Sequence, residues 1–311
     1  MKFFEIDKIN KCINQDVNKF ILESEKTYQQ QLASVANQLK TECNEKPIIL
    51  LSGPSGSGKT TTAMRIDNLL DSWGHETHTL SMDNYYLPTN SAPVPVDENG
   101  NIDYESPLRL DIELLNDHLK KIFQCEEVEM PIFDFASQSR KGSIPLKRKK
   151  GELIILEGIH ALNPDVTGNS NDFSSCIYVS VRTRISSSSG NLLHPARIRL
   201  MRRLMRDKLF RGRTLEETIS LFKSVSRGEN LYIMPYKYRA KFNIDTFLPY
   251  EVSAYKDLLL PELMDAGELL TTNSDYTDIL RFLTQIESLS SDYIAKNSLV
   301  REFIGGSSFA Y

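Results

Sequence analysis

Five short segments predict the strands of one sheet, and those at 47–51 and 152–157 are mainly apolar runs. The five segments lie at residues 47–51, 77–81, 152–157, 177–181 and 242–247. Runs of this kind are typical of parallel strands that are buried on both faces. Apolar residues recur at helical spacing over residues 60–73, 112–123, 250–263 and 276–289. The pattern therefore predicts an α/β fold in which helices flank a mainly parallel central sheet.

A long amphipathic pattern occupies the start of the chain. Its apolar positions are Ile9, Ile13, Val17, Phe20, Tyr28, Leu32, Val35 and Leu39. This spacing predicts a long helix. We expect the helix to pack on the main domain; a dimerisation helix, and with it a homo-oligomer, is the alternative.

These patterns divide the chain into three parts. Residues 1–45 are an N-terminal helical extension, residues 46–270 the main α/β domain, and residues 271–311 a C-terminal helix and tail that pack on that domain or trail it. We expect a loop at 89–101, which is rich in proline, asparagine and glycine. The basic cluster at 147–150 predicts a solvated turn, and residues 301–311 a loose terminus.

The composition is that of an ordinary soluble protein. Of 311 residues, 40% are hydrophobic and 25% charged, and the net charge is -4. This balance argues against a general affinity for nucleic acid or for an anionic membrane. No apolar run approaches the ~18 residues of a membrane helix, and the first residues do not resemble a signal peptide. The four scattered cysteines suit a reducing compartment, so we expect a cytoplasmic protein.

The segment from Gly53 to Thr60 fits the phosphate-binding pattern G-x-x-x-x-G-K-[ST], known as the P-loop. A predicted strand precedes it and a predicted helix follows it, as the pattern requires. Its backbone N–H groups would surround the phosphates of a nucleoside triphosphate at the positive end of the helix. Lys59 would reach the terminal phosphates, and the Thr60 hydroxyl would hold Mg²⁺. The predicted nucleotide-binding residues are Gly53, Ser55, Gly56, Ser57, Gly58, Lys59, Thr60 and Thr61.

Two acidic residues follow predicted strands, at the edge of the sheet where ligands bind in α/β proteins. Asp83 comes after the strand at 77–81 and is a candidate general base for a substrate hydroxyl. A helix or turn cap is the alternative role for Asp83. Glu157 ends the strand at 152–157, the place from which P-loop proteins deliver an acid to the Mg²⁺ site.

The segment 197–213 departs from the acidic balance of the chain. Its basic residues are Arg197, Arg199, Arg202, Arg203, Arg206, Lys208, Arg211 and Arg213. Three interpretations are open: a solvated basic helix, a nucleic-acid patch and a lid over phosphates. Phosphoryl transfer places negative charge on oxygens that planar guanidinium groups bind well. Because the chain also contains a P-loop, we favour the lid.

Several blocks, in this order, resemble the uridine kinase family, within the wider group that includes phosphoribulokinase. They are Gly53 to Thr60, Asp83-Asn84-Tyr85-Tyr86, Ile102-Asp103 with Pro107 after it, Phe133-Asp134-Phe135, Glu157-Gly158-Ile159, and the arginine run from Arg202 to Arg213. The resemblance implies the three-layer P-loop NTPase fold. It also implies transfer of the ATP γ-phosphate to the 5′-hydroxyl of uridine or cytidine, with Mg²⁺ as the metal.

The resemblance implies roles for single residues as well. Asp83 would take the proton of the hydroxyl, and Asp103 would bind the ribose hydroxyls. The phosphates would be held by Lys59, Arg206 and Arg211, and the metal by Thr60 and Glu157. The nucleoside would be contacted by Tyr86, Phe133, Phe135, Gln138, Arg203 and Arg213.

Three positions depart from the usual family pattern. Gln138 stands where histidine is common, Leu221 where glutamine is frequent, and Phe133 where tyrosine is frequent. All three affect recognition of the base, and none affects the phosphate chemistry. A kinase of the same fold acting on another nucleoside, a sugar phosphate or pantothenate is therefore an alternative.

A non-catalytic, nucleotide-dependent regulatory module is a further alternative. The sequence contains neither the N-K-x-D motif of a GTPase switch nor the L-S-G-G-Q motif of a transporter ATPase. A regulator would also not be expected to keep Asp83 together with the arginine run. Asp103 and the aromatic pair Phe133 and Phe135 favour a nucleoside among the acceptors.

Overall fold

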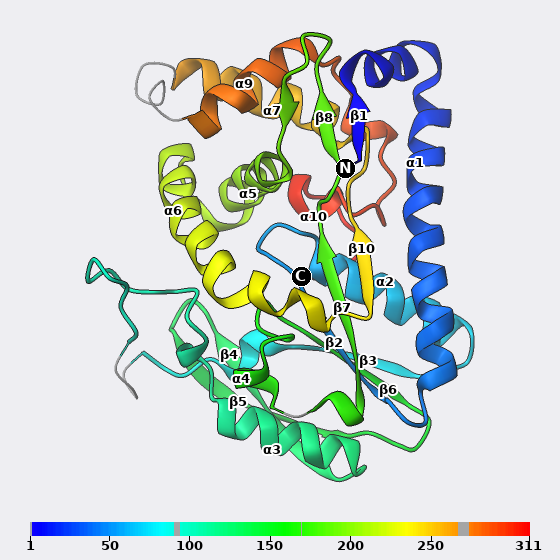
Figure 1. Cartoon of the computed structure of the whole chain (residues 1–311), viewed down its shortest axis with the longest axis vertical. Coiled ribbons are helices and arrows are strands. Elements are labelled where there is room, and N and C mark those ends of the chain that lie inside the picture. The colour runs from blue at the N-terminus through cyan, green and yellow to red at the C-terminus, as the bar shows by residue number, and fades with distance from the viewer. Residues whose placement is uncertain (1, 90–93, 169, 267–273) are drawn as a thin grey trace.

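The computed structural model describes residues 2–89, 94–168, 170–266 and 274–311, and it confirms an α/β fold built on a parallel sheet (Figure 1). The strands of this sheet are β2 (Ile48–Ser52), β3 (Thr77–Ser81), β6 (Leu153–Glu157), β7 (Ser174–Ser180) and β10 (Phe242–Asp245). Their order is β10-β7-β2-β6-β3, and every neighbouring pair is parallel. The strand that leads into the P-loop is therefore the middle strand.

Alternate residues of β2 enter two different hydrophobic clusters, one on each face of the sheet. Ile48 and Leu50 belong to the cluster that contains residues of α3 (Ile112–Phe123). Ile49 and Leu51 belong to the other, larger cluster. The helices that contribute to it include α1 (Ile6–Glu42), α2 (Lys59–Ser72), α5 (Pro195–Arg211), α6 (Leu215–Gly228), α7 (Glu251–Asp265) and α9 (Ser274–Gln285). Burial on both faces explains the continuous apolar runs and gives three layers.

The remaining described strands form two smaller sheets. The strands β1 (Phe3–Glu5), β8 (Arg184–Ser186) and β9 (Leu192–Leu193) form one of them. The other is the antiparallel hairpin of β4 (Glu127–Asp134) and β5 (Ser139–Lys147). The residues of β5 are mostly exposed, so no buried face marks this strand in the sequence. The short helix α4 (Pro164–Thr167) follows β6, and α10 (Arg301–Ile304) is the last helix of the described residues.

The long N-terminal helix packs on the rest of the chain, as its pattern predicts. Its apolar face, which includes Ile9, Leu32 and Leu39, is buried in the larger hydrophobic cluster. The Tyr28 hydroxyl shares a hydrogen bond of 2.7 Å with the hydroxyl of Thr62 on α2. In Figure 1 the helix runs along one side of the molecule. The apolar face of the helix is therefore covered within the chain itself.

The basic cluster at 147–150 is not entirely a solvated turn. Arg148 is only 5% exposed. Its guanidinium donates hydrogen bonds to the backbone oxygens of Ile122, at 2.9 Å, and Phe123, at 2.7 Å. These carbonyls lie in the last turn of α3, where the backbone oxygens lack the usual partner four residues on; that of Ile122 also accepts the backbone N–H of Cys125 at 3.1 Å. Arg148 thus caps the C-terminal end of α3, whereas its neighbour Lys149 is exposed.

The prediction of a loose terminus at 301–311 is wrong. Phe303 of α10 is fully buried, and its ring centre lies 5.1 Å from the guanidinium carbon of Arg202. Arg301 donates to the backbone oxygen of Ile294 at 2.7 Å. The segment returns to the middle of the molecule (red in Figure 1). It is held there by apolar burial that a local pattern of a few residues does not reveal.

Two predictions reach beyond the described residues. The loop at 89–101 includes residues 90–93, and the boundary at 270 lies within 267–273. Among the helices that the structure describes, none has the length and apolar character needed to cross a membrane.

We expect Phe303→Ala to lower the free energy of unfolding by about 3–5 kcal/mol, because loss of a fully buried ring leaves a cavity. Leu22→Ala is the control, since Leu22 is 68% exposed on α1; its effect should stay within about 0.5 kcal/mol. Urea unfolding followed by circular dichroism measures both variants. Equally small effects for the two would contradict the packing of the tail.

Candidate active site

The loop between β2 and α2 depends on glycine at three positions. Gly56 and Gly58 have φ angles of 73° and 80°, in the left-handed region that glycine adopts without strain. At Gly53 the constraint is space, because a Cβ there would lie 2.0 Å from the backbone oxygen of Val179. The loop leads directly into Lys59, the first residue of α2. It therefore ends at a helix N-terminus, where anions are favoured.

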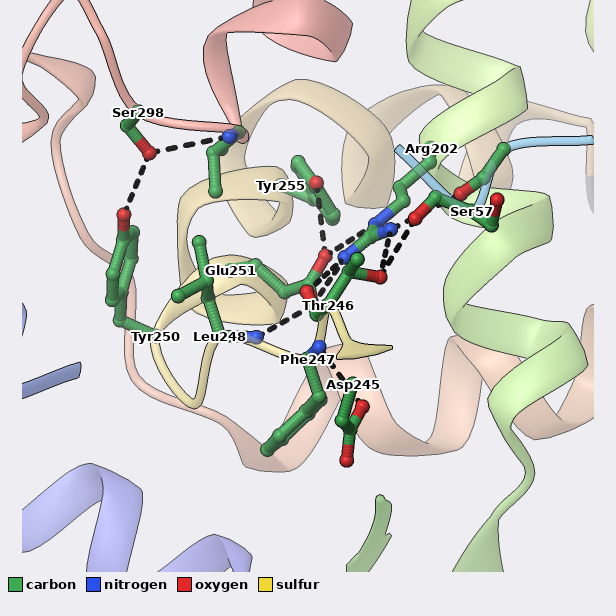
Figure 2. Close-up of polar contacts among 12 residues, drawn as sticks. Ser57, Arg202, Asp245, Thr246, Phe247, Leu248, Tyr250, Glu251, Tyr255 and Ser298 are labelled. Carbon is green, nitrogen blue, oxygen red and sulfur yellow. Dashed lines mark hydrogen bonds and ion pairs between the residues drawn. The ribbon is translucent and has the colours of Figure 1, made fainter. Parts of the chain in front are cut away.

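Figure 2 shows a buried ion pair that holds this loop in place. Arg202, with no exposed surface, donates to the backbone oxygens of Gly56 at 3.1 Å and Thr246 at 2.8 Å. The same guanidinium contacts the Glu251 carboxylate at 2.7 and 3.0 Å. The Thr246 hydroxyl donates to the backbone oxygen of Ser57 at 2.7 Å. Arg202 therefore supports the loop and is not part of a phosphate lid, which corrects its expected role.

Apart from Arg197, which lies 3.6 Å from Asp278, the remaining arginines of this segment divide between the loop and a cavity. Arg199 donates to the backbone oxygen of Ser55 at 3.0 Å and pairs with Glu229 at 2.6 Å, so it too supports the loop. Those that line the cavity are Arg203, Arg206, Arg211 and Arg213. All four lie near the buried Asp207 carboxylate, at 3.4, 3.0, 3.3 and 3.5 Å. One acid thus holds together four cations that would otherwise repel one another.

A cavity of about 950 Å³ lies over the P-loop and the carboxyl ends of β3 and β6. The predicted site residues that line it are Ser55, Gly56, Gly58, Lys59, Thr60, Asp83, Tyr86, Phe135, Gln138, Glu157, Arg203, Arg206, Arg211 and Arg213. The predicted site residues outside its lining are Gly53, Ser57, Thr61, Asp103 and Phe133.

Aromatic rings form one wall of the cavity. The rings of Tyr86 and Phe135 lie 5.9 Å apart at an angle of 77°. Phe133 is buried beside both, with ring centres at 5.8 and 5.2 Å. Gln138 accepts a hydrogen bond from Arg109 at 3.4 Å and donates one to the backbone oxygen of Phe135 at 2.8 Å. The wall therefore combines ring faces with an amide and a guanidinium.

Asp83 lies in a single 3₁₀ turn, Met82–Tyr85, directly after β3. The turn is capped by Ser81, whose hydroxyl accepts the backbone N–H of Asp83 at 3.3 Å. The Asp83 carboxylate is thus not the cap and instead lines the cavity. Burial raises the pKa of Asp83, and the charges of Lys59 and two arginines of α5 oppose the rise. A carboxylate close to these cations can accept a proton from a bound hydroxyl.

Glu157, at the end of β6, lies beside the first turn of α2. Its carboxylate accepts hydrogen bonds from the hydroxyls of Thr60 at 3.4 Å and Ser81 at 3.3 Å. Burial raises the pKa of Glu157 to about 7, and the charge of Lys59 opposes the rise. Hydroxyl and carboxylate oxygens are the ligands that Mg²⁺ prefers. The donor set therefore fits a magnesium ion.

Several residues that line the cavity were not predicted from the sequence: Tyr104, Glu105, Arg109, Ser224 and Glu302. Glu105 follows Asp103 by two positions, so its closeness to a recognised block was a usable signal. Burial raises the pKa of Glu105 to about 7. Glu302 lies in the segment at 301–311, which was expected to be a loose terminus. It accepts a hydrogen bond from Thr61, whose hydroxyl also lies 3.0 Å from that of Tyr311.

The P-loop follows the central strand of a parallel sheet, and acidic residues stand at the carboxyl ends of β6 and β3. Arginines lie across the cavity from them. Together these features define a P-loop kinase. The model of the Phosphoribulokinase / Uridine kinase family matches residues 48–253. The chain belongs to this family.

Individual relatives agree with this family. A uridine kinase from Anoxybacillus flavithermus is 30% identical over 220 residues, which cover 70% of this chain and 87% of that protein. A uridine kinase from Staphylococcus aureus is 32% identical over 216 residues, 69% of this chain and 87% of that protein. The structure of a candidate fructose transport system kinase from Silicibacter sp. TM1040 matches with a TM-score of 0.53 and 18% identity, covering 68% of this chain and 98% of that one. This last match shows the shared fold.

We expect Glu157→Gln to stabilise the nucleotide-free protein at pH 8 and to have little effect near pH 4.5. The folded-state pKa of about 7 lies above the ordinary value of 4.5, so the native state binds more protons than the unfolded state between these values. Stability is therefore lost as the pH rises through the folded pKa, by at most about 3 kcal/mol for this group. Glu157→Gln has no carboxyl group to ionise and therefore does not lose this stability. Thermal unfolding across the pH range, without nucleotide or metal, measures the difference.

The control is Glu113→Gln, at an exposed position of α3, which should leave the pH profile unchanged. Addition of ATP and Mg²⁺ should reverse the order and stabilise the wild-type chain more than Glu157→Gln. Parallel pH profiles for the wild-type chain and Glu157→Gln would contradict the environment described for Glu157.

Proposed function

We propose that this kinase transfers the γ-phosphate of ATP to the 5′-hydroxyl of a pyrimidine nucleoside, uridine or cytidine. The observation that carries the proposal is the meeting of two sets of residues in one cavity. Lys59, Thr60 and Glu157 lie on the phosphate side, and Tyr86 and Phe135 lie on the other wall. The similarity to uridine kinases of two bacteria supports the nucleoside.

The acceptor side suits a planar base attached to a sugar. A flat ring can pack against Tyr86 and Phe135, since aromatic faces favour stacking and edge contacts. The Gln138 amide offers both a donor and an acceptor to the polar edge of a pyrimidine. Arg109 holds Gln138 by a hydrogen bond of 3.4 Å and lies 5.5 Å from the Tyr86 ring centre. We infer that these two residues replace the histidine common in the family.

The chemistry requires positioning and charge. The Asp83 carboxylate takes the proton from the acceptor hydroxyl, and the hydroxyl oxygen forms a bond to the γ-phosphorus. The bond between that phosphorus and the bridging oxygen breaks, and ADP leaves with the electron pair. Lys59, Arg206 and Arg211 stabilise the negative charge on the transferred group. Thr60 and Glu157 would hold Mg²⁺, which would supply positive charge to neutralise the phosphates.

We expect Asp83→Asn to lower kcat by at least about 100-fold, because the amide cannot accept the hydroxyl proton. Its affinity for ATP should remain close to that of the wild-type chain, because the P-loop is untouched. A matched control is Asp117→Asn, at an exposed position of α3. A coupled assay of ADP release and a separate titration with ATP give the two values. Full turnover by Asp83→Asn would refute its role as base.

The acceptor itself is tested by measuring ADP release with a panel of compounds. We expect turnover with uridine and cytidine well above the background hydrolysis of ATP. Turnover only with another nucleoside, a sugar phosphate or pantothenate would replace the proposed acceptor and keep the kinase. Turnover with another acceptor would agree with the differences from the usual family residues at Gln138 and Leu221. ATP binding without turnover of any acceptor would favour a regulatory module.

A further inference from the structure

The aromatic wall of the cavity contains an arginine with no ion-pair partner among the residues that the structure describes. This residue, Arg109, lines the cavity and is 7% exposed. The other four arginines in the lining share the carboxylate of Asp207. We propose that Arg109 binds the carbonyl oxygen at C4 of a uracil base and thereby selects uridine over cytidine. This inference rests on the proposed function and concerns the acceptor end of the same cavity.

The backbone and the neighbouring rings hold Arg109 in place. It is the last residue of a 3₁₀ turn, Pro107–Arg109, that precedes α3. Its backbone oxygen accepts the N–H of Leu87 at 2.8 Å, which ties it to the chain beside Tyr86. The guanidinium carbon lies 5.5 Å from the ring centre of Tyr86 and 5.4 Å from that of Tyr104. Contacts with two rings stabilise a charge that is removed from water.

Most of the hydrogen-bonding capacity of Arg109 remains for a ligand. A guanidinium has five N–H groups and no acceptor. Within the described parts of the chain, this side chain donates one hydrogen bond, to Oε1 of Gln138 at 3.4 Å. That distance is long for an N–H···O contact. A buried charge with so few partners is costly, and a ligand oxygen in the cavity would lower this cost.

The Gln138 amide is held in one orientation. Its oxygen accepts the hydrogen bond from Arg109, and its nitrogen donates to the backbone oxygen of Phe135 at 2.8 Å. Because a guanidinium only donates and a carbonyl only accepts, exchange of the amide oxygen and nitrogen would break both contacts. Gln138 also has a φ angle of 51°, which is uncommon for residues other than glycine and recurs at ligand-binding sites. The wall therefore presents a donor, Arg109, next to an acceptor, the Gln138 oxygen with its second lone pair.

Arg109 and the base Asp83 contact the same aromatic residue from different parts of the cavity. Burial raises the pKa of Asp83, and the charges that oppose this rise come from Lys59 and two arginines of α5, not from Arg109. Burial also raises the pKa of Tyr86; the charge of Asp83 adds to this rise, and the charge of Arg109 opposes it. Tyr86 is therefore close to both groups, which are not close to each other. A nucleoside with its 5′-hydroxyl at Asp83 and its base on Tyr86 extends the C4 edge, which is far from the sugar, toward Arg109.

Uracil and cytosine present opposite polar groups at this edge. Uracil has an accepting oxygen at C4 and a donating N–H at N3, whereas cytosine has a donating amino group and an accepting nitrogen. Uracil therefore matches the Arg109 guanidinium and the Gln138 oxygen. With cytosine, the amino group would face N–H donors, and N3 would face an oxygen lone pair. Leaving buried polar groups unpaired in this way disfavours cytidine.

The test measures kcat/KM for uridine and for cytidine with the full chain, and the KM for ATP is the internal control. We expect the wild-type chain to favour uridine by about 10- to 100-fold, the effect of leaving a buried donor unpaired. Arg109→Met keeps a long side chain but removes the donors and the charge. It should lose most of this preference, mainly through a lower kcat/KM for uridine. Its KM for ATP should change less than about threefold, because the P-loop is untouched.

The matched control is Arg140→Met, which removes an arginine from the same region. Arg140 pairs with Asp111 at 3.0 Å and lies outside the cavity lining. This variant should keep the wild-type preference even where it lowers the melting temperature. A ratio of two acceptors in one variant is insensitive to the fraction of folded protein, so a loss confined to Arg109→Met supports the inference. Retention of the preference in Arg109→Met, or its equal loss in both variants, would overturn it.

Failure of the proposed function gives a different result. Equal kcat/KM for uridine and cytidine in the wild-type chain, or a preference for cytidine, overturns the inference about Arg109 and leaves the nucleoside proposal intact. Turnover of a sugar phosphate, pantothenate or another nucleoside, with neither uridine nor cytidine accepted, refutes the nucleoside proposal, and the inference falls with it. Absence of turnover with every compound overturns both.

Discussion

The buried pair of Arg202 and Glu251 is the interaction on which the phosphate-binding loop depends. Removing both charges from water is costly, and the cost is offset because each group has further hydrogen bonds. Arg202 donates to the backbone oxygen of Gly56, and Glu251 accepts the backbone N–H of Leu248 at 3.1 Å. Phe303 packs against the guanidinium. Segments far apart in the sequence thus meet at one side chain, and loss of either charged partner of such a pair costs about 3–5 kcal/mol.

The helix α5 performs two tasks because its arginines point in different directions. Arg199 and Arg202 are three positions apart and share one face, which supports the loop. Arg203 and Arg206 are the next such pair, and they line the cavity around Asp207. The number of basic residues alone does not separate the two tasks. Burial and backbone contacts do, and they show that the same helix shapes the phosphate site and supplies its charges.

Local patterns were sufficient to predict the central sheet, its flanking helices and the P-loop, because each depends on short-range spacing. They failed where a residue's role comes from distant contacts. Arg148 belongs to a basic run but ends α3 through carbonyls at residues 122 and 123. Glu302 reaches the cavity from the segment at 301–311, which was expected to be a loose terminus. Glu105 lines the cavity two positions after Asp103, which lies outside the lining and accepts hydrogen bonds from Arg227 and Tyr232.

The position of the tail has a consequence for how the protein is made. The contact between Thr61 and Glu302 joins residues that are 241 positions apart, and Leu299 lies against the P-loop at Gly58. Closing so long a loop of chain is slow compared with forming a helix or a hairpin. A nascent chain that has not yet reached residue 299 lacks this part of the wall. The sheet and the P-loop helix can therefore form during synthesis before residue 302 has been added, whereas the cavity wall is completed only after it.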